Sequence, residues 1–86
     1  MNLIRQCIFK EVDAERDRQD ILHPNQDYLS PAEWHIILSE EVGEVATEIC
    51  DNIFKKTSMD NYRAELIQVA ATAIRIIETH DKMNKE

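Results

Sequence analysis

Turn-forming residues are scarce in this chain, and their scarcity limits what it can fold into. Only one glycine and two prolines occur among 86 residues. Glycine and proline are the residues that most often mark turns between helices and strands. Because the chain has so few of them, we expect few secondary-structure elements, each of them long. A many-stranded sheet needs many turns and is therefore disfavoured. We expect one all-α domain covering residues 1–86.

Hydrophobic spacing predicts three helices in this chain. They cover roughly residues 2–19, 30–54 and 59–80, with a loop at 21–29 and a tail at 81–86 that is expected to fray. The second half of the first helix is strongly charged, so it either buries little or lines something polar. A chain this short has little surface to bury, and oligomerisation is a common remedy. We therefore expect an antiparallel bundle of three helices that oligomerisation completes.

The second helix has the clearest predicted start. Ser30 is a good N-cap, Pro31 suits the first helical position, and Glu33 completes a capping box. Lys55 and Lys56 stand at its end, where positive charge complements the helix dipole.

Charge and hydropathy exclude several functional classes. The formal net charge is −7, from 17 acidic and ten basic residues. Such a chain repels nucleic-acid backbones, so we expect no nucleic-acid polymer as partner, whereas a small phosphorylated ligand bridged by a divalent cation remains possible. No apolar run approaches the about 18 residues of a membrane span. The start of the chain lacks a signal-peptide layout, and Cys7 and Cys50 are expected to be free, buried thiols, so we expect a cytoplasmic protein without a membrane partner.

Three glutamates of the second helix lie together on one edge of its apolar stripe. Glu41, Glu44 and Glu48 are three and four residues apart, immediately beside the stripe and not on the opposite face. The stripe consists of Trp34, Leu38, Val42, Val45, Ile49 and Ile53.

The third helix carries a narrow polar strip on an otherwise apolar surface. The strip consists of Glu65, Gln68, Thr72, Arg75 and Thr79. The remaining apolar arc is wider than one partner helix needs, so we expect a second subunit to cover part of it.

Antiparallel packing of these two helices would bring Glu41 and Glu44 opposite Glu65 and Gln68. Carboxylates that meet near a core repel one another unless a hard cation lies among them, and magnesium prefers such oxygen ligands. The same acids at helical spacing are also what a solvated rim would contain, because glutamate is a good helix former. Spacing alone leaves both interpretations open. The three histidines have no metal-ligand spacing, so zinc is not expected.

An ordered set of motifs resembles a known enzyme family. The run Leu38 to Ala46, which contains Glu40, Glu41 and Glu44, resembles the EExxE element of the all-α nucleotide pyrophosphohydrolases, the MazG and dimeric dUTPase-like superfamily. The stretch from Glu65 to Gln68 is similar to that family's second element, ExxD. The resemblance covers roughly residues 11–80 and is closest to small MazG-like proteins.

The resemblance implies an α-helical dimer or tetramer that cleaves a nucleoside triphosphate with magnesium, giving the monophosphate and pyrophosphate. Glu41, Glu44 and Glu65 match the family's metal ligands. Gln68 occupies the place of the family's Asp, and its amide oxygen can coordinate Mg²⁺ but brings no charge. Mn²⁺ is an expected substitute. Glu40, which matches the first acid of the motif, or Glu44 would take the proton from the attacking water.

Several basic and polar residues are candidate substrate contacts. Arg16, Lys55, Lys56 and Arg63 are candidates for the distal phosphates, although residues of this kind are more often plain surface charges. Gln19 and Trp34 are candidates for contact with a base, but Trp34 begins the apolar stripe, which favours core packing for it.

Two other functional classes stay open beside hydrolysis. Gln68 favours a nucleotide- or metal-binding helical oligomer with weak or no catalysis. The third possibility is a purely structural helical oligomer whose acids only confer solubility.

Overall fold

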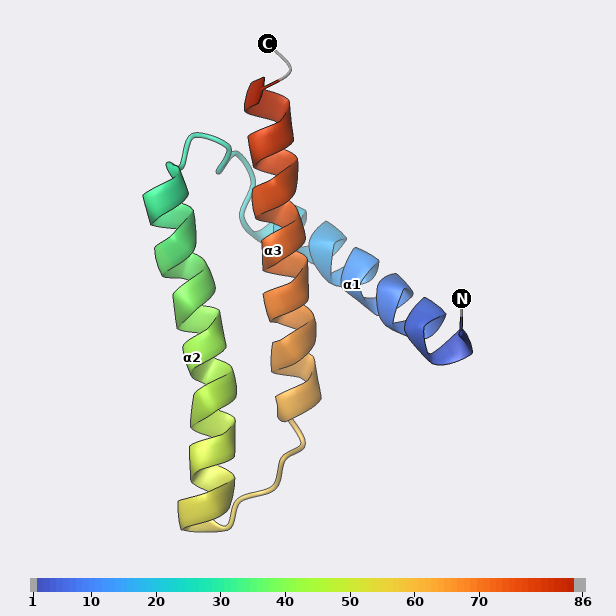
Figure 1. The fold of residues 1–86 in the computed structure, drawn as a ribbon, viewed down its shortest axis with the longest axis vertical. Coiled ribbons are helices and arrows are strands. Elements are labelled where there is room, and N and C mark those ends of the chain that lie inside the picture. The colour runs from blue at the N-terminus through green and yellow to red at the C-terminus, as the bar shows by residue number, and fades with distance from the viewer. Residues whose placement is uncertain (1, 85–86) are drawn as a thin grey trace.

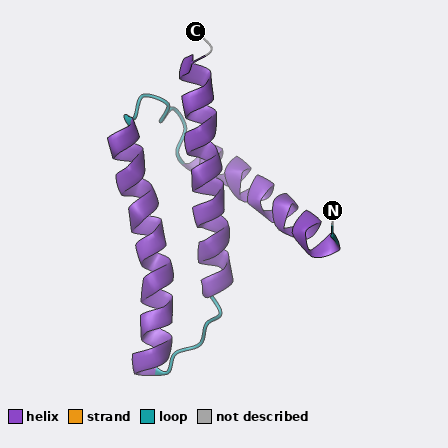
Figure 2. Ribbon diagram, in the orientation of Figure 1, coloured by secondary structure: helices purple, strands orange, loops and turns teal. Residues whose placement is uncertain are grey.

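The computed structural model describes residues 2–84, and these form three helices and no strand (Figure 2). Helix α1 covers Leu3–Leu22, α2 covers Pro31–Lys55 and α3 covers Tyr62–Asn84. The predicted all-α class and the number of helices are confirmed. No helix in this part of the chain is long and apolar enough to cross a membrane.

Local side-chain chemistry sets where the helices begin and end. The Ser30 hydroxyl accepts from the Glu33 N–H at 3.2 Å and the Glu33 carboxylate accepts from the Ser30 N–H at 3.0 Å, so the predicted capping box is present. Helix α2 ends where Lys56 takes a left-handed conformation with φ 59°. At the start of α1, the Asn2 side chain accepts from the Arg5 N–H at 2.7 Å.

The expected fray after His80 is wrong for the described part of the tail. Helix α3 continues to Asn84, whose side-chain amide donates to the His80 carbonyl at 2.9 Å. Lys82 pairs with Asp27 of the α1–α2 loop at 3.4 Å. These contacts extend the last turns, while residues 85–86 lie outside the described part of the chain.

Helix α3 lies at the centre of the fold (Figure 1). Helix α2 runs antiparallel along one side of it, whereas α1 crosses α3 steeply and its N-terminal end projects away. Helices α1 and α2 pack on α3 but not on each other. The antiparallel bundle of the prediction therefore describes α2 and α3, and α1 departs from it.

The interior between the helices is mostly polar. Only three apolar residues are buried among those described, namely Val12, Trp34 and Ala71. The buried polar residues are Arg16, Gln19, Thr72, Arg75 and Thr79. The polar strip of α3 thus faces the other two helices, and part of its apolar arc is left outside. Of the apolar stripe predicted on α2, only Trp34 is buried.

The dimensions show how open a single chain is. Its radius of gyration is 14.8 Å, whereas a compact domain of this length has about 12 Å. Its accessible surface is 6507 Å², against about 5,300 Å² for a folded monomer of this mass. Cys7 and Cys50 are free but exposed, so the prediction of buried thiols is wrong. They lie on helix faces that no other part of the described chain covers.

Candidate functional site

The three helices bring five glutamates together in one region. Glu41, Glu44 and Glu48 come from α2 and Glu65 from α3, and the charge of Glu15 from α1 acts on Glu41. The α2–α3 part of this acidic cluster is the juxtaposition that antiparallel packing predicted. Glu15 was missed as a member, because only the crossing of α1 over α3 brings it near.

Glu65 lies in the most strained electrostatic environment of the acidic cluster. Burial raises the pKa of its carboxyl, and a hydrogen bond with Glu44 and the charges of Glu44, Glu48 and Glu41 raise the pKa further. Its Oε2 atom has no exposed surface and no hydrogen-bond partner. A proton or a cation would relieve this repulsion, since the cluster holds more negative charge than its surroundings neutralise.

Glu41 is held from the other side by a neutral donor. The Thr72 hydroxyl lies 2.9 and 3.0 Å from the two Glu41 carboxylate oxygens and accepts from the Gln19 side-chain amide at 3.1 Å. This chain of hydrogen bonds joins all three helices. Burial and the nearby charges of Glu44 and Glu15 raise the pKa of Glu41, whereas the Thr72 bond and His23 oppose the rise.

The donor set of the acidic cluster fits a hard divalent cation in charge and in atom type. Carboxylate oxygens are what Mg²⁺ prefers, and the unpartnered Oε2 of Glu65 is a free ligand atom at the centre. Within residues 2–84, however, no three acid, histidine or cysteine side chains converge closely enough to hold a metal ion. Coordination would therefore need side-chain rotations in the glutamates of α2, of which Glu44 is exposed and Glu41 and Glu48 are partly buried.

Gln68, a predicted metal ligand, and Glu40, a predicted base, lie at the edge of the acidic cluster or beyond it. Gln68 lines a hollow between α1 and α3 with Glu15, Arg18 and Arg63. Glu40 is exposed on α2. Gln68 thus lies with Arg18 and Arg63 on the wall of the α1–α3 hollow.

A polar cavity of about 260 Å³ adjoins Glu41 between the three helices. Gln19, Trp34, Thr72 and Arg75 help to line it. Each of Gln19 and Trp34 also has one buried polar atom without a hydrogen-bond partner, the Oε1 acceptor of Gln19 and the Nε1 donor of Trp34. Because buried polar atoms are nearly always satisfied, two such atoms in residues that line one cavity are a feature to explain.

Arg75 fixes the wall of this polar cavity. Its guanidinium carbon lies 5.3 Å from the centre of the Trp34 ring, and its Nη2 donates to the His23 carbonyl at the end of α1. Thr72 and Arg75 were predicted on the polar strip of α3 but not as site residues. Their burial together with an unpartnered glutamine and tryptophan depends on tertiary packing, which the strip alone does not reveal.

The predicted phosphate-binding residues are placed very differently from one another. Arg16 is buried and bound to Glu78 of α3 through two hydrogen bonds of 3.1 and 2.8 Å, and it also pairs with Asp20 at 2.9 Å. These bonds raise its pKa further above the ordinary range and make it a tether between α1 and α3. Lys55 is exposed and pairs with Asp51 at 3.5 Å near the end of α2.

Arg63 lies nearer to the acidic cluster. It binds Glu11 through both ends of its guanidinium and lines the α1–α3 hollow with Arg18. Arg18 was not predicted, and its i, i+3 pairing with Glu15 was the only signal for it.

Comparison with known proteins places no relative beside this chain. No protein-family model, no curated protein and no solved structure matches it.

Proposed function

We propose that this protein is a magnesium-dependent nucleoside triphosphate pyrophosphohydrolase of the MazG-like kind. The observation that carries the proposal is the acidic cluster on three helices next to a polar cavity lined by Gln19 and Trp34. A ligand with a planar polar ring at one end and phosphates at the other would use both features.

Glu41, Glu44 and Glu65 are the proposed ligands of Mg²⁺, for which Mn²⁺ would substitute. When bound, the ion neutralises phosphate charge and lowers the pKa of a coordinated water. Thr72 keeps the Glu41 carboxylate oriented through its hydrogen bonds. Burial and the neighbouring acids raise the pKa of Glu65, and a bound cation would oppose that rise and favour the ionised carboxylate.

The other groups of the proposed site would contact the base and the phosphates of the nucleotide. Trp34 and Gln19, which line the polar cavity, would contact the base. The acidic cluster would hold the α-phosphate, and Arg63 with Arg18 would contact the distal phosphates after exchanging their carboxylate partners. Glu44, which interacts with Glu65, is a better candidate than Glu40 for accepting a proton from water, since Glu40 lies outside the acidic cluster.

A second candidate function is nucleotide binding without efficient hydrolysis. It is favoured by Gln68, which brings no charge and lies with the arginines of the α1–α3 hollow. The two candidates predict the same metal and nucleotide binding but differ in the release of pyrophosphate.

We also propose that a second copy completes the fold as a homodimer or as part of a homotetramer. Val42, Ile49 and Ile53 of α2 and Leu66 of α3 are between 38% and 54% exposed. These four residues, called here the outer α2–α3 face, would be covered by the same face of the partner. A standard interface buries about 800 Å² on each partner, less than the excess surface of the single chain.

The deciding experiment measures pyrophosphate released from a panel of ribo- and deoxynucleoside triphosphates with Mg²⁺ or Mn²⁺. We expect release by the wild type and its loss in Glu41→Gln and in Glu65→Gln. Asp13→Asn, which removes an exposed acid of α1, is the matched control and should keep activity. Absence of pyrophosphate with every substrate would refute the enzyme. Gain of release in Gln68→Asp would then identify a binding site that has lost catalysis.

A further inference from the structure

The first turns of α1 form an apolar arm. Leu3 and Ile4 are 77% and 75% exposed, and Cys7 is exposed as well. Together with Ile8 they are spaced as one face of a helix. We call residues 3–10 the α1 arm. Figure 1 shows it projecting away from α2 and from the C-terminal half of α3. A helix end with an uncovered apolar face is marginal in water, because most helical stability comes from packing that face.

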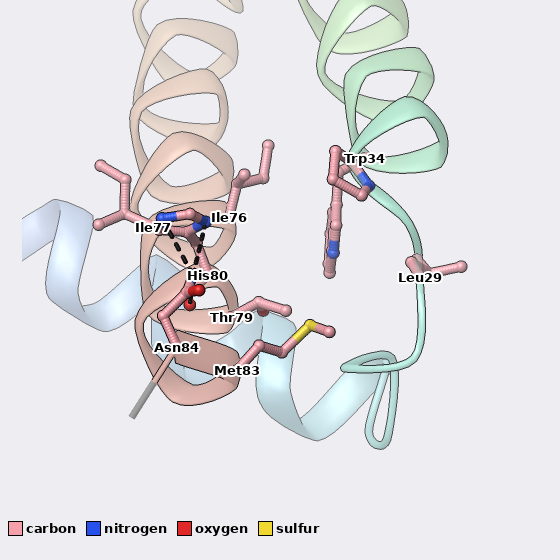
Figure 3. Close-up of a pocket in the computed structure, with 9 residues that line it drawn as sticks. Leu29, Trp34, Ile76, Ile77, Thr79, His80, Met83 and Asn84 are labelled. Carbon is pink, nitrogen blue, oxygen red and sulfur yellow. Dashed lines mark hydrogen bonds between the residues drawn. The ribbon is translucent and has the colours of Figure 1, made fainter. Parts of the chain in front are cut away.

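A separate apolar groove lies between the start of α2 and the end of α3. Its volume is about 480 Å³, and Trp34, Ile76, Ile77 and Met83 form much of its lining. Figure 3 shows Met83 and Ile76 directed toward Trp34, with Leu29 on the far side. We call it the α2–α3 end groove. It is the largest and the most apolar of the pockets described.

The groove cannot receive the arm of its own chain. Helix α1 is continuous from Leu3 to Leu22, a length of about 30 Å. Its C-terminal half is fixed on α3 by Arg16 and Gln19, so the arm is held pointing outward. The occupant must come from another molecule.

Charge favours a second copy of this chain as that molecule. Residues 1–10 contain two basic residues, Arg5 and Lys10, and no acid. Residues 11–86 contain eight basic and 17 acidic residues, and 8 − 17 gives −9. Glu33 and Asp81 are exposed near the two ends of the groove lining, and the capping bonds of Glu33 lower its pKa and keep it charged. A basic arm and an acidic body attract each other between copies.

Area favours a contact beyond the outer α2–α3 face. The single chain exposes 6507 Å², about 1,200 Å² more than a folded monomer of its mass. One standard interface accounts for about 800 Å² per partner, and 1,200 − 800 leaves about 400 Å² for a second, smaller contact. We propose that the α1 arm of one copy seats in the α2–α3 end groove of another. This contact is distinct from the outer α2–α3 face and independent of hydrolysis.

Disulfide capture tests the contact with the cysteine that the arm already contains. In a Cys50→Ser background, Met83→Cys places a thiol in the groove, and mild oxidation should join it to Cys7 of another copy as a covalent dimer on non-reducing electrophoresis. Bond formation needs Cα atoms within about 7 Å, so random collisions react slowly. Cys50→Ser alone is the matched control, because it keeps the exposed Cys7 but has no thiol in the groove. A dimer that persists when Cys7→Ser is added, or no dimer at all, overturns the proposal.

Mass measurement in solution provides an independent test. Leu3→Glu with Ile4→Glu should raise the dissociation constant of this contact about 100-fold, since two aliphatic side chains lose their burial. Both residues are exposed in the single chain, so its helical circular dichroism should not change. Val42→Glu probes the outer α2–α3 face separately. A mass unchanged by the double substitution in the arm would overturn the proposal, whatever the result for Val42→Glu.

Discussion

Thr72→Val is predicted to destabilise the chain far more than Thr79→Val, the same substitution two helical turns later on the same face of α3. The Thr72 hydroxyl donates to Glu41 and accepts from Gln19, so its loss removes both bonds between helices. A hydrogen bond to a charged group contributes about 1.5–3 kcal/mol, and a buried donor left unpartnered costs about 1–3 kcal/mol. Valine recovers part of this through its methyl group. We expect a net loss of about 2–4 kcal/mol in the free energy of unfolding.

Thr79→Val is the matched control for this prediction. Thr79 is also buried on α3, but its hydroxyl bonds only to the Arg75 carbonyl of the same helix, at 3.0 Å. Both substitutions keep a β-branched shape, so helix propensity and packing volume change alike. We expect about 1 kcal/mol or less for Thr79→Val. The assay is urea denaturation with every variant at the same protein concentration. Any contribution of association to stability is then the same for all of them.

The same network makes a further test possible by removing both partners. Adding Gln19→Met to Thr72→Val takes away the donor that Thr72→Val leaves unpartnered, so the double variant should be less destabilised than the sum of the single ones. A Thr72→Val cost no larger than that of Thr79→Val, or strict additivity in the double variant, would refute a bridge between the three helices.

Three further outcomes follow from the acids and the arginines. Because the pKa of Glu65 is raised in the folded state, its contribution to stability should fall as pH rises above about 4.5. Glu65→Gln should therefore melt at a higher temperature than the wild type at neutral pH. Thermal unfolding of both proteins from pH 4.5 to 8 measures this difference. Millimolar Mg²⁺ should raise the melting temperature of the wild type and have less effect on Glu65→Gln, which calorimetry can compare. Arg16→Met should cost about 2 kcal/mol in urea unfolding, because a buried guanidinium loses its hydrogen bonds to the Glu78 carboxylate. Arg63→Met breaks an exposed pair with Glu11 and should leave the urea midpoint almost unchanged.

Features set by short-range chemistry were predictable from the sequence. Ser30, Pro31 and Glu33 are neighbours, and their capping box depends on nothing outside them. The approach of Glu44 to Glu65 needed only the antiparallel packing of two consecutive helices. The tail after His80 was harder, because its last turn is extended by contacts of Lys82 and Asn84 rather than by an apolar face.

Features set by long-range packing were not predictable in the same way. Arg16 was interpreted as a phosphate ligand, because no local pattern in the sequence indicates that it pairs with Glu78, 62 residues further along the chain. Glu15 and Arg18 joined the site only because α1 crosses α3 instead of running alongside it. The polar strip of α3 was predictable from the sequence. Its burial was not, because it depends on which face of α3 packs against α1 and α2.

That choice of face connects the candidate site with the proposed assembly. Because α3 turns Thr72, Arg75 and Thr79 toward the other helices, hydrogen-bonding groups are concentrated between them, and the polar cavity results. The same rotation leaves Leu66 and Ile77 on the outside, 40% and 59% exposed. Turning α3 to bury these apolar side chains within one chain would separate Thr72 from Glu41 and Gln19. A substitution that only disrupts association should therefore leave the cavity's hydrogen bonds intact, whereas Thr72→Val should weaken the site without exposing the α1 arm further.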